Sequence, residues 1–92
     1  MTTEAELLAK VQASIATAIG AEPSELTPEK KIFQELGVDS VDFLDISYEV
    51  EQETGFDVTA IFDGEEPSAE LTIQGLVDLL RTRLEEGDRN VA

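Results

Sequence analysis

Ser40 has the best-defined chemical setting of any side chain in the sequence. It lies in the stretch GVDSVDFLDI, residues 37–46, directly after Asp39. A serine nucleophile needs a base within hydrogen-bond reach, but the chain contains no histidine and no lysine lies close to Ser40 in the sequence. The neighbouring carboxylates also raise the cost of forming an alkoxide. We therefore interpret Ser40 as a serine that is acted upon, and we assign no catalytic residue.

The acidic residues near Ser40 do not follow a known metal-binding pattern. A calcium-binding EF-hand loop needs oxygen ligands at alternate positions with a central glycine and a terminal glutamate. Asp39, Asp42 and Asp45 are instead spaced by three, and the chain lacks the histidine and cysteine that usually bind zinc. We therefore assign no metal site, although weak divalent-ion binding by an acidic surface is compatible with the sequence.

The charge of the chain is strongly negative and unevenly distributed. Asp and Glu number 21 against six Lys and Arg, which gives a formal net charge of −15. Between Ile32 and Leu80 there is no basic residue at all. This charge argues against binding to nucleic acid or to an anionic membrane surface, because both would repel the chain. Partners with basic surfaces are expected.

The length of 92 residues allows one domain with a small core. No stretch approaches the ~20 apolar residues needed to span a bilayer, so no membrane span is expected. The absence of cysteine fits a cytoplasmic protein without disulfides. We expect a monomer with a single domain over residues 1–92, an ordered core over about residues 3–86 and a frayed tail at residues 87–92.

Apolar residues recur at helical spacing in three segments, at residues 3–19, at residues 39–54 and from Thr72 onward. A short helix is expected around residues 59–63. The segment of residues 20–38 contains two glycines and two prolines and is expected to form a long loop. No alternation of period two appears. The sequence therefore predicts an all-α bundle of three longer helices and one short helix, with a long first loop.

The expected helix at residues 39–54 carries more apolar residues than its packing requires. At about 100° per residue its side chains divide into three strips along the helix. One strip is apolar and suffices to dock the helix on a core: Phe43, Ile46 and Val50. The second strip is also apolar and needs another purpose: Val41, Leu44 and Tyr48. The third is polar and mostly anionic: Asp42, Asp45, Glu49 and Gln52.

The sequence around Ser40 resembles the acyl carrier protein family, in particular its discrete, type II members. The stretch ELGVDSVDFLDI, residues 35–46, matches the family pattern (D/E)-L-G-x-D-S-L-(D/E)-x-(V/L)-(E/D)-(L/I). The resemblance implies that Ser40 carries 4′-phosphopantetheine, donated from coenzyme A by a separate magnesium-dependent phosphopantetheinyl transferase. Asp39 would help to organise the metal during that transfer. The chain would then be a carrier of acyl thioesters and not an enzyme.

The resemblance also implies two further sites. A docking surface for the transferase, acyltransferases and acyl-chain synthases would comprise Val41, Asp42, Asp45, Glu49 and Glu51. A pocket beside Ser40, in which the acyl chain could shelter, would be lined by Leu44, Tyr48, Ile61, Phe62 and Leu76.

The pathway that such a carrier would serve is a separate question. Residues 39–46, DSVDFLDI, are more similar to specialised carriers of very long acyl chains for lipid A than to general fatty acid carriers, whereas Val41 and Tyr48 depart from the usual family residues. Two alternatives remain at this stage. One is a carrier of aminoacyl or polyketide intermediates. The other is an acidic helical adaptor, or divalent-ion-binding module, in which Ser40 only helps to start a helix.

Overall fold

The computed structural model describes residues 3–62 and 65–90, with side chains described as far as residue 85. In chain order the elements are α1 (Glu4–Ile19), the 3-10 helix η1 (Pro23–Glu25), α2 (Ser40–Thr54), α3 (Val58–Phe62) and α4 (Ile73–Asn90). The prediction of an all-α fold with three longer helices and one short helix is confirmed. Over the described ranges, the only β-type pairing is an isolated bridge between Lys31 and Thr72.

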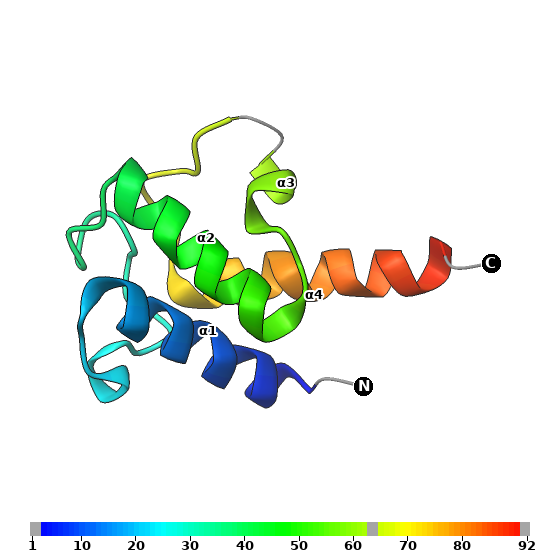
Figure 1. Ribbon diagram of the computed structural model, residues 1–92, viewed down its shortest axis with the longest axis horizontal. Helices are drawn as coiled ribbons and strands as arrows, with labels where there is room; N and C mark the ends of the chain where they lie inside the picture. The colour runs from blue at the N-terminus through cyan, green and yellow to red at the C-terminus, as the bar shows by residue number, and fades with distance from the viewer. Residues whose placement is uncertain (1–2, 63–64, 91–92) are drawn as a thin grey trace.

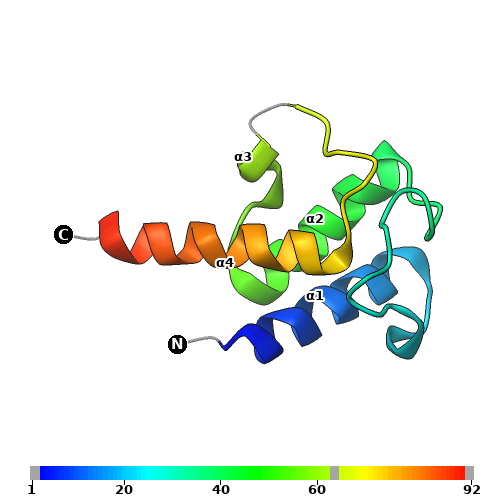
Figure 2. The same ribbon diagram turned by 180° about the vertical axis from the view of Figure 1, so that it is seen from behind.

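The helices form a small bundle in which α1 and α2 run antiparallel and α4 lies behind α2 (Figure 1). α1 packs against α2 and α4, and the short α3 contacts α2 and α4. Seen from behind, the C-terminal turns of α4 project beyond the other helices (Figure 2). Within the part of the chain that the structure describes, no helix is both long enough and apolar enough to cross a membrane.

The ends of α1 and α2 are set by local capping residues. The Thr3 hydroxyl accepts a hydrogen bond of 3.1 Å from the backbone N–H of Glu6 and so caps the start of α1. Gly20 ends α1 with a φ of 72°, and Gly55 ends α2 with a φ of 76°. These positive φ angles strain residues with a side chain, so glycine is favoured at both helix ends.

The ends of α3 and α4 differ slightly from the predicted ones. α3 begins at Val58, and residue 63, its predicted last residue, lies outside the described residues. α4 continues through Gly87 to Asn90, whereas the sequence predicted a frayed tail from residue 87; residues 91–92 are outside the described range. A single glycine costs a helix only about 1 kcal/mol relative to alanine, so α4 can pass through it.

The core lies between α1, α2 and α4 and is mainly aliphatic. The first apolar strip of α2 is buried, as the sequence predicted, with Ile46 and Val50 fully inaccessible and Phe43 only 6% exposed. The fully buried side chains from the other long helices are Leu7, Val11, Ile15, Ile73, Leu76, Val77 and Leu80. Burial of each such side chain stabilises the fold by roughly 1.5–3 kcal/mol.

The first loop, residues 20–39, is fixed to the segment that leads into α4. Ile32 is fully buried, and its backbone N–H donates to the carbonyl of Leu71 at 2.9 Å. The backbone N–H of Ile73 donates in turn to the carbonyl of Lys30 at 3.0 Å. Because these bonds join residues about forty positions apart, they hold two loops together at one end of the bundle.

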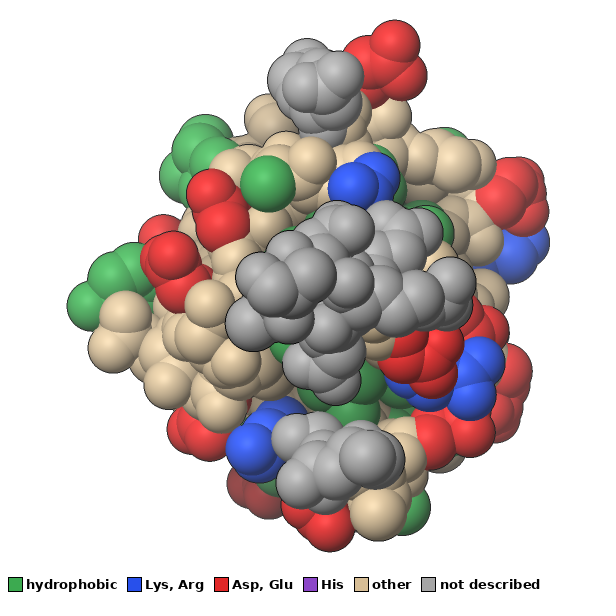
Figure 3. All heavy atoms as spheres, turned by 90° about the vertical axis from the view of Figure 1, so that its right-hand side faces the viewer, with side chains coloured by type: hydrophobic (Ala, Val, Ile, Leu, Met, Phe, Trp, Pro, Cys, Tyr) green, Lys and Arg blue, Asp and Glu red, His purple; other side chains and the backbone are tan. Residues whose placement is uncertain are grey.

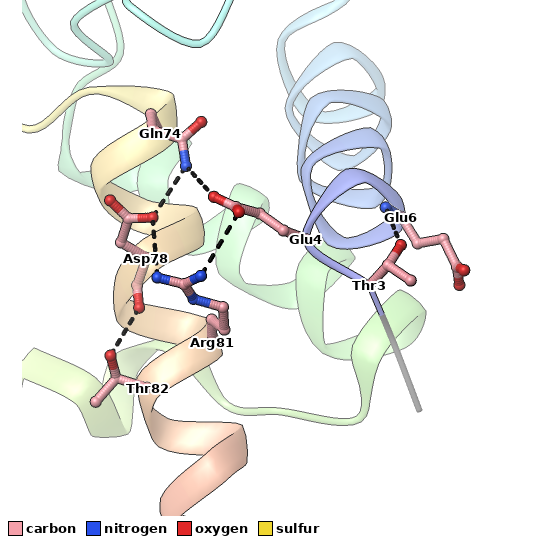
Figure 4. A network of polar contacts seen from close by, with 7 residues as sticks. All are labelled: Thr3, Glu4, Glu6, Gln74, Asp78, Arg81 and Thr82. Carbon is pink, nitrogen blue, oxygen red and sulfur yellow. Dashed lines mark hydrogen bonds and ion pairs between the residues drawn. The ribbon is translucent and has the colours of Figure 1, made fainter.

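A polar network joins the start of α1 to α4 (Figure 4). Glu4 accepts a hydrogen bond from Gln74 at 3.1 Å and pairs with Arg81 at 3.5 Å. Gln74 also donates to Asp78 at 2.9 Å. All these groups are exposed or partly exposed, so the network orients the two helices more than it stabilises them.

Candidate functional site

Ser40 is the first residue of α2, and Asp39 is its N-cap. The Asp39 carboxylate accepts a hydrogen bond from the backbone N–H of Asp42 at 2.8 Å, while the Asp42 carboxylate accepts from the N–H of Asp39 at 3.4 Å. This reciprocal pair is a capping box. Just before it, Gly37 has a φ of 69° and Val38 is buried, so the chain turns sharply into α2. The start of α2 is therefore well fixed.

The Ser40 side chain is exposed at this fixed helix start. Among the described residues, none forms a hydrogen bond with its hydroxyl. The described side chains also contain no group of three or more His, Cys, Asp or Glu placed to hold a metal ion. Ser40 is thus accessible to another protein, and no described side chain is hydrogen-bonded to it as a base.

The second apolar strip of α2 lies on the surface. Val41 is 66% exposed, and Leu44 and Tyr48 are each 60% exposed. Their spacing of three and four residues places them on one side of the helix, directly after Ser40. The sequence-based division of α2 into a buried strip and a second strip therefore corresponds to the structure, and the second strip is available for contacts with other molecules.

Carboxylates border this apolar strip. At about 100° per residue, Asp42, Asp45 and Glu49 lie together along one flank of the strip, and Glu51 lies on the opposite flank. Asp45 and Glu51 are exposed, whereas Asp42 and Glu49 are partly buried. Acidic side chains are also visible on several sides of the end of the molecule at which α4 terminates (Figure 3). The predicted docking residues thus all lie on α2, but their carboxylates lie on two opposite flanks of the apolar strip.

A cavity of about 520 Å³ opens beside Ser40. α2 contributes Ser40, Phe43 and Leu44 to its lining, and α3 contributes Thr59 and Phe62. The remaining lining residues come from the first loop and from the loop before α4: Phe33, Glu65, Glu66, Pro67 and Ala69. The volume is in the range of sites that bind small organic ligands. The lining is mostly apolar, so the cavity suits an apolar group attached near Ser40.

Three phenylalanine rings form a continuous arc in the wall of this cavity. The ring centroids of Phe33 and Phe43 are 5.3 Å apart, and those of Phe43 and Phe62 are 5.9 Å apart with an edge-to-face angle of 70°. Phe43 belongs to the buried core, while Phe33 and Phe62 are partly buried and packed against it. The arc therefore has the cavity on one side and the core on the other.

The cavity agrees only in part with the pocket predicted from sequence. Leu44 and Phe62 line it as expected. Tyr48 does not, because it lies one helical turn farther along α2 and faces outward. Ile61 and Leu76 do not line it either, because both are buried in the core, at 8% and 0% exposure.

Apart from Phe43 and Thr59, the lining residues that the sequence did not suggest come from distant segments. Phe33 lies in the first loop, and Glu65, Glu66, Pro67 and Ala69 lie in the loop after α3. Neither segment has a hydrophobic period that indicates which side chain faces Ser40. The one available signal was the interruption of the apolar pattern by Pro67 and its acidic neighbours, which marks a loop without showing where it folds.

An ion pair holds the loop that forms one wall of the cavity. The Lys31 ammonium lies 2.9 Å from the Glu70 carboxylate, which also accepts a hydrogen bond of 3.4 Å from Gln34. The hydrogen bond from Lys31 lowers the pKa of Glu70 most, and the positive charge of Lys31 lowers it further. The hydrogen bond to Glu70 and its negative charge raise the pKa of Lys31. Both groups are accessible to solvent, so the pair positions the loop more than it stabilises the fold.

Comparison with known proteins agrees with this arrangement. A family model described as "Phosphopantetheine attachment site" matches residues 9–64. An acyl carrier protein of Thermotoga maritima is 34% identical over 58 residues, which cover 63% of this chain and 72% of that protein. Acyl carrier protein 2 of Ralstonia nicotianae is 32% identical over 53 residues, covering 58% of this chain and 65% of that protein. A meromycolate extension acyl carrier protein of Mycobacterium tuberculosis is 36% identical over 53 residues, covering 58% of this chain and 46% of that protein.

The matched segment contains Ser40, the whole of α2 and α3 and most of α1. It extends over more than half of the chain, and the prosthetic group that it denotes is 4′-phosphopantetheine. The similar proteins are named as acyl carrier proteins, which are carriers rather than enzymes. The chain belongs to the acyl carrier protein family.

Proposed function

We propose that Ser40 is the attachment residue for 4′-phosphopantetheine and that the chain delivers acyl thioesters to enzymes of fatty acid or lipid biosynthesis. The observation that carries this proposal is the position of Ser40, whose exposed hydroxyl lies both at the start of α2 and at the rim of an apolar cavity. A single carrier domain of this kind needs no catalytic residue. The Ser40 oxygen takes the phosphopantetheinyl phosphate as the pyrophosphate bond of coenzyme A breaks and adenosine 3′,5′-bisphosphate leaves. A separate magnesium-dependent transferase supplies the metal and the base that accepts the Ser40 proton.

The residues at the start of α2 fit such a group. An anionic phosphodiester on Ser40 would lie at the positive end of the α2 dipole, which favours negative charge. The terminal thiol of the group, when bound, supplies the sulfur on which acyl chains are held as thioesters. Asp39 directly precedes Ser40, and its carboxylate would help to hold the magnesium ion of the transferase during attachment.

The exposed strip of α2 is the proposed docking surface for the transferase, acyltransferases and synthases. Val41, Leu44 and Tyr48 would supply apolar contact next to Ser40. The carboxylates of Asp42, Asp45 and Glu49 on one flank, and of Glu51 on the other, would steer basic partner surfaces into the correct orientation. Electrostatic complementarity of this kind affects the association rate and the orientation more than the final affinity.

The cavity beside Ser40 favours an apolar acyl chain as cargo. The similarity of residues 39–46 to carriers for lipid A supports the more specific proposal that the acyl cargo is long. One similar mycobacterial protein is named a meromycolate extension acyl carrier protein. We propose that the protein acts as a monomer in the cytoplasm, a reducing compartment that suits a chain without cysteine.

Intact-mass spectrometry tests the attachment directly. The protein is incubated with coenzyme A, magnesium and a broad-specificity phosphopantetheinyl transferase, in parallel with the Ser40→Ala variant. The wild-type chain should gain one phosphopantetheinyl increment and the variant none. If wild type gains nothing while a known carrier in the same tube is modified, Ser40 serves only as a helix-start residue, as an acidic adaptor would require.

A second measurement identifies the cargo. The thioester is released from protein purified from the native cells and analysed by mass spectrometry. A long fatty acyl group supports the proposed cargo, whereas an aminoacyl or polyketide group would assign the carrier to a different pathway with the same attachment chemistry.

A further inference from the structure

The cavity beside Ser40 is short along the axis of α2. Its lining includes Ser40, Phe43 and Leu44, but neither Ser47 nor Tyr48 of the next turn. On α3 it includes Thr59 and Phe62, whereas the neighbouring Val58 and Ile61 are buried in the core. An acyl chain that enters this cavity from the phosphopantetheine arm on Ser40 therefore reaches a wall close to the point where α2 and α3 face each other.

That wall is the arc of Phe33, Phe43 and Phe62, which separates the cavity from the core. The three rings differ in how firmly they are held. Phe43 is 6% exposed and lies on the long helix α2, and Phe33 follows Ile32, whose backbone is bonded to Leu71. Phe62 is only partly buried and is the last residue of the five-residue α3.

We propose that Phe62, through its edge-to-face contact with Phe43, sets the longest acyl chain that this carrier can shelter. The inference rests on the proposed attachment at Ser40. A chain that fits in front of the rings is removed from water along its whole length, and each buried methylene stabilises the loaded protein. Carbons beyond this limit meet the Phe62 ring and remain in solvent. Phe62 is thus a specificity-determining residue for cargo length.

The structure provides a matched control for this role. Phe56 is also partly buried and packed against the core near α3, but it does not line the cavity. Phe56→Ala and Phe62→Ala remove the same atoms from similarly buried positions, and only the second enlarges the space in front of Ser40. A Phe62→Leu variant removes less volume and tests the same point if Phe62→Ala fails to fold.

The experiment measures stability as a function of chain length. Wild type and the variants are loaded by a broad-specificity transferase with saturated acyl-coenzyme A thioesters of even length, from butyryl to palmitoyl. Loading is verified by intact mass, and the melting temperature of each acyl form is compared with that of the same protein carrying the unacylated group. In wild type the melting temperature should rise with chain length and then level off.

In Phe62→Ala the levelling-off should occur at a chain longer by roughly four carbons, since the space left by the ring is only partly closed by relaxation. Phe62→Leu should show a smaller extension, and Phe56→Ala none. The inference is overturned if Phe62→Ala or Phe62→Leu levels off at the wild-type length, or if wild type does not level off within the series. Failure of the proposed function looks different, because no acyl adduct then forms on any protein.

Discussion

Asp39 combines two roles that substitution can separate, namely capping α2 and assisting the modification of Ser40. The structure shows its carboxylate accepting a hydrogen bond of 2.8 Å from the backbone N–H of Asp42. The return bond from the backbone of Asp39 to Asp42 is longer, at 3.4 Å, and contributes less. Asp39→Ala removes the cap, whereas Asp39→Asn keeps a side-chain oxygen at the capping position and removes only the charge.

The expected loss of stability follows from the cap. Replacing an N-cap Asp by Ala costs about 1 kcal/mol, within a range of roughly 0.5–2 kcal/mol. For a domain of this size, a loss of about 1 kcal/mol lowers the melting temperature by roughly 4–8 °C. Asn caps helices about as well as Asp. The Asn substitution also removes one negative charge from a chain with a net charge of −15, which slightly relieves its self-repulsion. The melting temperature of Asp39→Asn should therefore be close to that of wild type.

The effect on modification should follow the charge instead. If the Asp39 carboxylate helps to hold the transferase metal, both Asp39→Ala and Asp39→Asn should slow phosphopantetheinylation by about 10- to 100-fold, a loss typical of groups that orient a metal site. Thermal melts monitored by circular dichroism and intact-mass time courses below the melting temperature measure the two effects separately. Equal melting temperatures for the Ala and Asn variants would refute the capping argument. A wild-type rate for Asp39→Asn would refute the metal role.

Three further predictions concern docking, the first loop and the ion pair at the cavity wall. Asp45→Lys or Glu49→Lys should slow the modification of Ser40 in low salt. The difference from wild type should become smaller as salt is added, because screening weakens interactions between surface charges. A rate equal to that of wild type at every salt concentration would exclude steering by these groups. Ile32→Ala should lower the free energy of unfolding by about 2–5 kcal/mol in urea titrations, since Ile32 is fully buried. A change below about 1 kcal/mol would show that this side chain does not fix the first loop. Glu70→Gln should lower stability slightly at neutral pH. Lys31 lowers the pKa of Glu70 from its ordinary value of 4.5. The contribution of this ion pair to stability is therefore present above pH 4.5 and is lost as the pH falls through the lowered pKa. The urea midpoints of wild type and Glu70→Gln should accordingly converge in acid.

The prediction of the helices from sequence succeeded because the features that define them are local. Thr3 and Gly20 cap the two ends of α1, and Asp39 and Gly55 cap the two ends of α2. Both pairs act through contacts within one helical turn. The apolar strips of α2 follow from the same short-range periodicity. Ser40 was also recognisable from its immediate neighbours, since the absence of a base and the surrounding carboxylates are properties of the sequence alone.

The composition of the cavity was decided only by tertiary structure. Phe33 and Pro67 line the same cavity as Leu44 although they lie in separate loops, and their meeting depends on long-range backbone bonds such as that between Ile32 and Leu71. The sequence places Tyr48 beside Leu44 on α2, but whether a side chain there faces a cavity or solvent depends on where α3 and the following loop cover the helix. Local periodicity determines which residues share a helix face, and only the packing of distant segments determines what that face encloses.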